Sequence, residues 1–316
     1  MNAGLSEAPA ADNRIVLHGL RSEEYEHSFD RQALRALKST PGFEFLVRKL
    51  NEYSMDRLNR IRYTGSNIKL NAQVMPEIHN ILFRACEILD MQFVPEMYVA
   101  WSYNVNAFTA GVERPIVVVT SGAVDLLTHE ELAFLIGHEL GHIKSGHVLY
   151  HQMADILPLL GSIVASATLG IGGLVSTGIQ LALLNWDRMS EFTADRAGLL
   201  VCQNATTAGS VLMKAAGVPM KYFDQVSVAS FLDQAREFEG YDYDAFDRVA
   251  KVLSTMSLGH PWTVLRASEM LKWIDTGEYA AVISRPAASR ACPRCGRGLV
   301  GQEVFCPKCG TRVSRQ

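Results

Sequence analysis

The chain has 316 residues, of which 48% are hydrophobic and 20% are charged. These values exclude a disordered chain, a collagen-like repeat and a small disulfide scaffold, and they allow one large or two modest domains. The net charge of −3 is unevenly distributed: residues 285–316 carry seven basic residues and one acid, whereas the rest carries 23 basic and 32 acidic residues. The chain therefore has an acidic body (−9) and a basic tail (+6), and the tail holds four of the six cysteines.

The hydrophobic periodicity predicts a mainly helical α+β protein with one small sheet. We expect four parts, which are a flexible N-terminal arm at 1–22, a body at 23–284, a linker at 285–291 and a cysteine module at 292–316. Helical patterns occupy residues 23–37, 43–60, 76–89, 128–142 and 188–204 and continue to about residue 274. Two β-rich runs lie between these helices, at 97–103 and 115–120.

The cysteines fall into two kinds. Cys86 and Cys202 stand alone in apolar helical patterns, so we predict that both are core residues. The N-terminus has no apolar run behind a basic leader, which predicts a cytoplasmic protein. In such a reducing compartment, clustered cysteines bind metal more often than they form disulfides.

The motif that carries chemistry is HExxH, formed by His138, Glu139 and His142. Thr128 and Glu131 form a capping box that opens its helix. Histidines four residues apart share one face of a helix, so both imidazoles can reach one zinc ion. Glu139 can then deprotonate a zinc-bound water. A structural zinc site would not need this glutamate and would usually have four protein ligands.

A catalytic zinc needs a third protein ligand and one open position. His147 follows His138 by nine residues, which predicts the opposite side of a continuous helix and a packing or supporting role. Downstream, Glu191 and Asp195 are again four residues apart. One of them can ligate zinc while the other accepts the free N–H of a ligating histidine.

The motifs HELGH, RMSEFTAD (188–195) and NAFTAG (106–111) together resemble the HtpX and CAAX-prenyl-protease type of zinc metalloendopeptidase, a gluzincin group. The similarity covers roughly residues 76–273. It implies that Glu191 is the third zinc ligand and that Asp195 supports the histidines. It also implies that an edge strand borders the cleft and can pair with an extended peptide, the strand being that of Asn106, Ala107 and Phe108.

The same resemblance assigns two residues near the end of the body. It implies that His260 and Arg266 hydrogen-bond the substrate carbonyl and the tetrahedral oxyanion. An alternative for His260 is an ordinary residue at the start of a helix.

The stretch 156–186 contains 31 residues without a charge, a length that admits a membrane span. A single crossing would place His142 and Glu191 on opposite sides of the bilayer, and two crossings need about 40 residues. We therefore expect a buried hairpin or a lid over the cleft. A peripheral membrane contact is the second alternative, which would make the protein membrane-associated.

The tail repeats the knuckle C-P-x-C-G, with Cys292 and Cys295 in the first copy and Cys306 and Cys309 in the second. Two such pairs predict a structural Cys₄ zinc site of the zinc-ribbon kind. The partner of this ribbon stays open. The acidic body and the absence of an aromatic-basic stripe argue against a nucleic-acid partner.

The sequence thus predicts a zinc-dependent endopeptidase that acts on protein or peptide substrates, including misfolded or membrane-associated ones, and that holds one catalytic and one structural Zn²⁺. The alternative function is a proteolytically quiet adaptor or chaperone-like protein that keeps the zinc fold and acts through its ribbon. The intact Glu139 speaks against that alternative, because a binding protein needs no general base.

Overall fold

The computed structural model describes residues 13–40, 43, 47, 55–154, 171–239, 263–284, 290–295, 297–299, 304–306 and 309–313. Its elements in chain order are η1 (Ser22–Glu24), α1 (Ser28–Lys38), α3 (Met55–Ser66), β1 (Ile68–Lys69), α4 (Pro76–Ile88), β2 (Glu96–Ala100), β3 (Ala107–Ala110), β4 (Ile116–Thr120), α5 (Ser121–Leu126), α6 (His129–Lys144), α8 (Ile171–Cys202), α9 (Ala205–Ala215), η2 (Met220–Tyr222), α10 (Val228–Glu239), α12 (Thr263–Asp275), α13 (Glu278–Ile283), β5 (Arg290–Ala291) and β6 (Gly298–Leu299). The predicted α+β class with a mainly helical body and one small sheet is confirmed.

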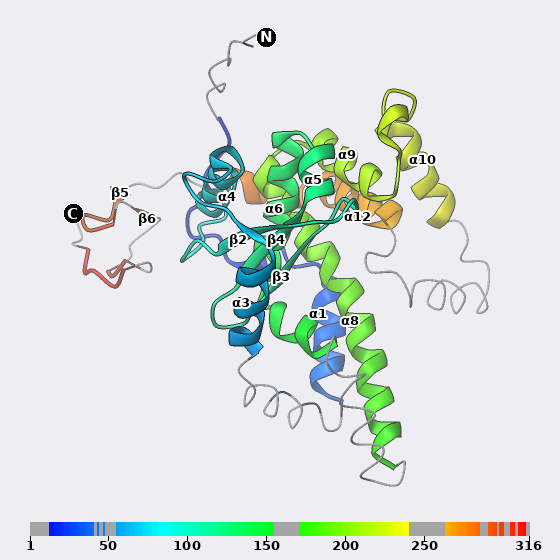
Figure 1. Cartoon of the computed structure of the whole chain (residues 1–316), viewed down its shortest axis with the longest axis horizontal. Coiled ribbons are helices and arrows are strands. Elements are labelled where there is room, and N and C mark those ends of the chain that lie inside the picture. Colours follow the sequence, from blue (N-terminus) through cyan, green and yellow to red (C-terminus); the bar gives the residue numbers. More distant parts are fainter. Residues whose placement is uncertain are drawn as a thin grey trace.

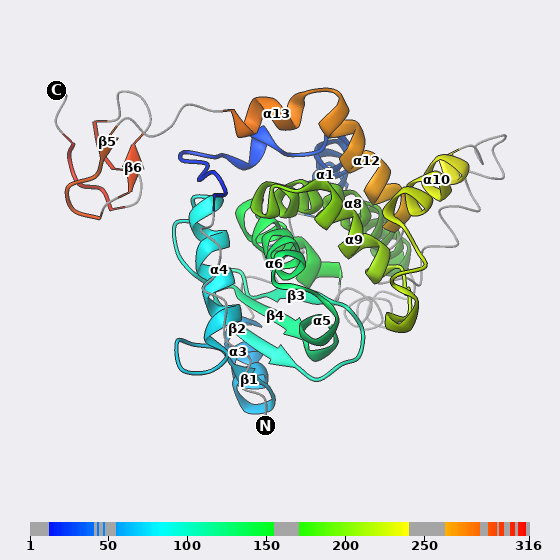
Figure 2. The ribbon, with the colours of Figure 1, turned by 90° about the horizontal axis from the view of Figure 1, so that it is seen from above.

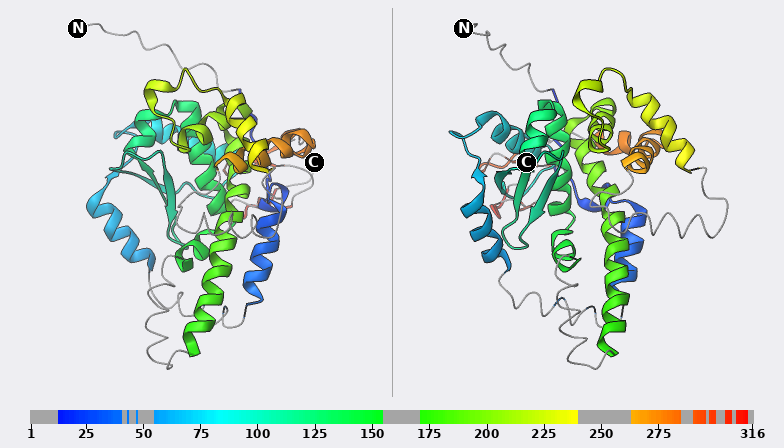
Figure 3. Two further views of the ribbon diagram at one scale, coloured as in Figure 1. Left: turned by 90° about the vertical axis from the view of Figure 1, so that its right-hand side faces the viewer. Right: turned by 45° about the vertical axis from the view of Figure 1, so that its right-hand side comes forward.

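A four-stranded sheet forms one layer of the body, in the order β1-β2-β4-β3. Strands β2 and β4 are parallel, and the two outer strands pair antiparallel to them. Alternate residues of the sheet enter different apolar clusters: Tyr98 and Val118 pack with Tyr63 of α3, whereas Met97 and Val117 join the cluster that contains α4 and α6. Figure 3 shows the sheet between α3 and α6. Because both faces are covered, the central strand β4 consists of buried residues.

Helix α6 begins at the predicted capping box. The Thr128 hydroxyl accepts from the Glu131 N–H, and the Glu131 carboxylate accepts from the Thr128 N–H at 2.8 Å. The helix ends at Lys144, and Gly146 follows with φ +72°, a conformation that favours glycine. The expectation of a continuous helix as far as His147 is therefore wrong, because this turn redirects the chain.

Helices α6 and α8 approach each other very closely. A Cβ atom built on Gly141 would lie 2.6 Å from the Ala197 Cβ, and one on Gly137 would lie 2.6 Å from the Val201 Cβ. Gly137, just before the HELGH motif, and Gly141, within it, thus have a packing role, because they let the backbones of α6 and α8, both labelled in Figure 1, approach closely. This contact brings the two pairs of predicted site residues together.

The described half of the charge-free stretch, residues 171–186, forms the first half of α8. Three of its side chains, Ile179, Leu183 and Trp186, are buried and pack with Ala33 and Leu37 of α1. Residues 156–170 lie outside the described residues, so the expected hairpin or lid stays a prediction. Within the part of the chain that the structure describes, no helix combines the length and apolar character needed to cross a membrane.

At the N-terminus, Leu17 and Leu20 are buried in the main core, and the Leu17 N–H donates to the Ile88 carbonyl at 2.9 Å. Packing of the body thus extends into the segment expected to be an arm, while residues 1–12 lie outside the described residues. Cys86 and Cys202 are buried as predicted. Strands β5 and β6 belong to the cysteine module, which Figure 2 shows beyond the end of α13. There Arg297 forms an ion pair with Asp90 of the body.

Candidate active site

The three predicted zinc ligands converge in the core of the body. The Nε2 atoms of His138 and His142 lie 3.2 Å apart on one face of α6. From α8, the Glu191 carboxylate reaches both histidines, with its oxygens 3.6 Å from His138 Nε2 and 3.3 Å from His142 Nε2. All three side chains are buried. This convergence depends on the glycine contact between the two helices.

The donor set fits a zinc ion. Two imidazole nitrogens and a carboxylate oxygen are the ligands that zinc takes in catalytic sites, and the three atoms lie within 4.8 Å of one another. Burial holds the pKa of His142 well below its ordinary value, which favours the neutral imidazole that binds metal. A cation bound between two buried histidine nitrogens and a carboxylate would also offset their lone pairs.

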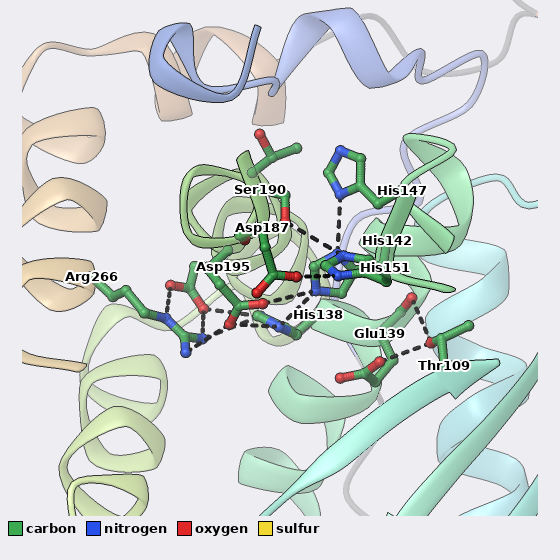
Figure 4. Close-up of polar contacts among 12 residues, drawn as sticks. Thr109, His138, Glu139, His142, His147, His151, Asp187, Ser190, Asp195 and Arg266 are labelled. Atoms are coloured by element: carbon green, nitrogen blue, oxygen red, sulfur yellow. Dashed lines mark hydrogen bonds and ion pairs between the residues drawn. The ribbon is translucent and has the colours of Figure 1, made fainter. Parts of the chain in front are cut away.

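Behind His138 stands the predicted supporting aspartate. Asp195 Oδ1 lies 3.0 Å from His138 Nδ1, a contact that leaves Nε2 of the same ring facing Glu191. Arg266 of α12 donates to both oxygens of Asp195, from Nε at 2.7 Å and from Nη2 at 2.6 Å (Figure 4). Burial alone would raise the pKa of Asp195, but the adjacent guanidinium holds it below its ordinary value.

Two residues near the end of the body were expected to contact substrate. Arg266 is 6% exposed, and its Nη1 lies 2.9 Å from Glu191 Oε2 while its other nitrogens face Asp195. The guanidinium therefore holds the two carboxylates, and its hydrogen bond to a substrate carbonyl stays a prediction. His260 lies outside the described residues.

Glu139 is held by the strand that borders it. The Thr109 hydroxyl on β3 donates to Glu139 Oε2 at 2.8 Å, as Figure 4 shows. The carboxylate is buried beside the ligand cluster, on the same helix as both histidines. The strand therefore fixes the orientation of the predicted general base.

Strand β3 is an edge of the sheet, as expected for the 106–108 segment, and it begins at Ala107. Asn106 precedes it and exchanges hydrogen bonds with Thr120, whose N–H donates to the Asn106 carbonyl at 3.0 Å. Ala107 is buried, and Phe108 packs against Tyr63 at 5.8 Å between ring centroids. The segment thus contributes a backbone edge, with its side chains used in packing.

A family model described as peptidase family M48 matches residues 72–274, which is more than half of the chain. The chain belongs to peptidase family M48. It is 32% identical over 273 residues, 86% of this chain and 78% of the relative, to a protein of Arabidopsis thaliana named plastoglobule-localized metallopeptidase 48, chloroplastic. It is 27% identical over 177 residues, 49% of this chain and 60% of the relative, to protease HtpX homolog 2 of Methanosarcina acetivorans. No solved structure matches the chain.

The resemblance inferred from the motifs is thereby confirmed. The M48 domain is of the HtpX type, and the protein is a zinc-dependent metalloprotease. The match spans the predicted ligands and ends before the cysteine module, so it bears on the body and not on the tail.

Sequence reasoning missed several residues of the M48 site. Thr109 lies inside the NAFTAG motif, and its position in that motif is the sequence feature that could have identified it as a site residue. His151 was also missed; it lies four residues after His147, for which the sequence had predicted a packing or supporting role. Both histidines have a ring nitrogen near His142 Nδ1, at 3.0 Å for His147 and 3.3 Å for His151. Asp30 of α1 has its Oδ2 3.1 Å from His147 Nε2, and no local sequence pattern predicts this contact.

The cysteine module gathers its four sulfurs within 4.8 Å of one another. The Sγ atoms of Cys292 and Cys309 are 3.6 Å apart, as are those of Cys295 and Cys306. The contact between Cys309 Sγ and the Thr311 hydroxyl, at 3.2 Å, lowers the pKa of Cys309 to about 6, which favours the thiolate. Four sulfurs in this arrangement fit a closed structural zinc site.

Proposed function

We propose that His138, His142 and Glu191 hold the zinc ion of this M48 protease and that Glu139 is its general base in hydrolysing peptide bonds within protein substrates. The observation that carries this proposal is the convergence of the three ligand atoms beside the Glu139 carboxylate. When bound, zinc supplies Lewis acidity, which polarises the scissile carbonyl and acidifies a water molecule.

In this proposal the chain's own groups move the protons. Glu139 accepts a proton from the attacking water and delivers it to the departing amine, while Thr109 keeps the carboxylate aimed by its hydrogen bond of 2.8 Å. Asp195 holds the ring of His138 in place, and Arg266 holds Asp195.

We further propose that an extended segment of substrate pairs with the free edge of β3. An edge strand offers the N–H and carbonyl groups of alternate residues to a peptide backbone. Because Asn106 and Thr120 are hydrogen-bonded between β3 and β4, Phe108 faces Val118 in the same way, and the backbone groups of Ala107 and Thr109 point to the outer edge. Thr109 belongs to this same strand and contacts Glu139, which supports delivery of the bound peptide to the base.

The tail and the location of the protein complete the proposal. Cys292, Cys295, Cys306 and Cys309 hold a second, structural zinc ion. The protein is cytoplasmic, and it reaches membrane-associated substrates by peripheral contact through the charge-free residues 156–186.

The decisive experiment compares wild type with Glu139→Gln on an unfolded protein substrate. We expect the variant to keep its zinc and to lose at least about 100-fold in cleavage rate, because the amide cannot accept the water proton. Glu130→Gln, an exposed position in the first turn of the same helix, is the matched control and should cleave like wild type.

Two outcomes would contradict the proposal. Equal cleavage by wild type and Glu139→Gln would remove Glu139 as the base. No cleavage by zinc-loaded wild type would favour the alternative, a proteolytically quiet adaptor or chaperone-like protein.

A further inference from the structure

The second nitrogen of each histidine ligand has a different neighbour. His138 turns its Nδ1 to a carboxylate, Asp195 Oδ1, at 3.0 Å. His142 turns its Nδ1 away from the ligand cluster, to His147 Nδ1 at 3.0 Å and to His151 Nε2 at 3.3 Å (Figure 4). A histidine that ligates a metal through one nitrogen normally donates its other N–H to an acceptor. The question is which of the two neighbours accepts this proton.

Proton counting identifies His147 as an acceptor. Its Nε2 lies 3.1 Å from Asp30 Oδ2, and a carboxylate can only accept, so Nε2 of His147 donates to Asp30. A His142 ring that ligates zinc through Nε2 carries its proton on Nδ1, and this N–H faces Nδ1 of His147 at 3.0 Å. Nδ1 of His147 is therefore its acceptor.

Asp30 is built to hold this orientation. It is fully buried, and it accepts from Trp186 Nε1 at 2.9 Å and from the Thr193 hydroxyl at 2.7 Å. Burial alone would raise its pKa, but the hydrogen bonds from His147, Thr193 and Trp186 lower it, so the group is a carboxylate. Three donors on two oxygens leave it little freedom to turn.

His151 is the weaker competitor. Asp187 Oδ1 lies 2.5 Å from its Nδ1, so that nitrogen donates, and Nε2 of His151 is shared between His142 Nδ1 at 3.3 Å and the Ser190 hydroxyl at 3.5 Å. This nitrogen is farther from His142 Nδ1 than His147 is, and the His151 side chain is 24% exposed whereas that of His147 is 1% exposed. The enclosed, shorter contact is the one that orients the ring, and His151 offers a matched control.

We propose that Asp30 and His147 are positioning residues for the zinc ligand His142, through the chain Asp30 to His147 to His142. This inference rests on the proposed zinc site. Each histidine ligand is then oriented by a carboxylate. Asp195 contacts His138 directly, and Asp30 acts on His142 through the imidazole of His147. Asp30 lies in α1, outside residues 72–274 that the M48 model matches, so the N-terminal helix contributes to the site.

The test measures zinc affinity by chelator competition in the full-length protein, together with the visible spectrum after cobalt substitution and the thermal unfolding of the metal-free form. His147→Leu removes the acceptor, and we expect about 10–100-fold weaker binding of the body's zinc and a changed cobalt spectrum. His147→Gln retains an oxygen acceptor and should recover most of the affinity. His151→Leu should weaken zinc binding less than His147→Leu, because its contact with His142 Nδ1 is longer, 3.3 Å against 3.0 Å.

A second measurement needs no variant. In ¹⁵N-histidine-labelled, zinc-loaded wild type, nitrogen shifts should report His147 with its proton on Nε2 and His142 with its proton on Nδ1. A proton on Nδ1 of His147 would overturn the proposal, even if His147→Leu failed to fold. So would wild-type affinity and an unchanged cobalt spectrum in folded His147→Leu.

Two controls separate this inference from the proposed function. His138→Ala must lose the body's zinc, and retention of that zinc would refute the proposed ligand set itself. If His138→Ala loses zinc while His147→Leu keeps wild-type affinity, only the positioning role fails. A further ion bound among His142, His147 and His151 would appear as one more zinc per chain, and it would overturn the donated N–H.

Discussion

Thr109 joins the sheet to the chemistry through a single hydroxyl, which donates to Glu139 Oε2 at 2.8 Å. Thr109→Val keeps the shape of the strand and removes the donor. We expect kcat to fall about 10-fold with zinc content unchanged, because the carboxylate loses the contact that aims it. Steady-state kinetics on an unfolded substrate measures this, with Thr109→Ser as the control that keeps the hydroxyl. Equal kcat values for the Val and Ser variants would contradict the role.

Arg266 offsets two buried carboxylates, those of Asp195 and Glu191. Arg266→Gln leaves both without their cation, and we expect the metal-free protein to lose about 3–5 kcal/mol of unfolding free energy. The loss should be smaller with zinc present, since the metal's positive charge also offsets Glu191. Urea unfolding with and without chelator measures both values.

The control for this prediction is Arg31→Gln, which breaks an exposed ion pair with Glu26 and should cost at most about 1 kcal/mol. A cost for Arg266→Gln as small as that of the control would show that the buried carboxylates do not depend on the guanidinium.

The sequence pointed to those site residues that local patterns bring together. HExxH fixes His138, Glu139 and His142 by helical spacing, and a second pair four residues apart marks Glu191 and Asp195. The contact of Asp30 with His147 and that of Arg266 with Asp195 were not predicted, because both join elements that are far apart in the chain. For His147 the sequence predicted a packing or supporting role but placed the ring on the opposite side of a continuous helix, whereas the turn at Gly146 brings it to His142.

At the scale of elements, the strongest constraint is the close packing of α6 on α8. Gly141→Ala would place a methyl group 2.6 Å from the Ala197 Cβ and push apart the helices that carry the ligands. We expect a lower melting temperature and weaker zinc binding. Gly65→Ala in α3 is the control, because nothing lies within 4 Å of its added methyl. It should be neutral or stabilising by up to about 1 kcal/mol.

Calorimetry and chelator competition on both glycine variants check this expectation. Wild-type zinc affinity in Gly141→Ala would mean that the two helices can separate without disturbing the ligands.

The bounds of elements with a local sequence pattern were predicted closely, whereas the bounds of those that depend on tertiary packing were not. The fourth helical pattern began at its capping box, and the predicted strand at 115–120 is β4, Ile116–Thr120. The helix expected to start near residue 188 starts at Ile171, because its glycine-rich opening has low helix propensity and gives no periodic signal. Tertiary packing of Leu183 and Trp186 against α1 stabilises the second part of that opening.

For the whole molecule, metal analysis should find two zinc ions per chain. Deletion of residues 285–316 should leave one, and His138→Ala in the full-length protein should also leave one, because each site has its own ligands. Inductively coupled plasma mass spectrometry on dialysed protein measures the ratio. One zinc in the full-length wild type would rule out the two-site proposal.

The charge division of the chain has a physical counterpart. Arg297 of the basic tail pairs with Asp90 of the acidic body, and Asp90 also accepts the Gly19 N–H at 2.6 Å. Composition predicted the sign of this attraction, whereas the residues that make it could not be chosen from sequence, because Asp90 is one of 32 acids in the body and its place depends on the turn after α4.

The contacts of Arg266 in α12 with the site have a consequence for folding during synthesis. During synthesis both histidines and Glu191 leave the ribosome before Arg266, which follows Asp195 by 71 residues. Until α12 has emerged, two acidic side chains lack the cation that offsets their burial, and enclosing them costs several kcal/mol. A nascent chain therefore carries its zinc ligands well before it can close a finished site.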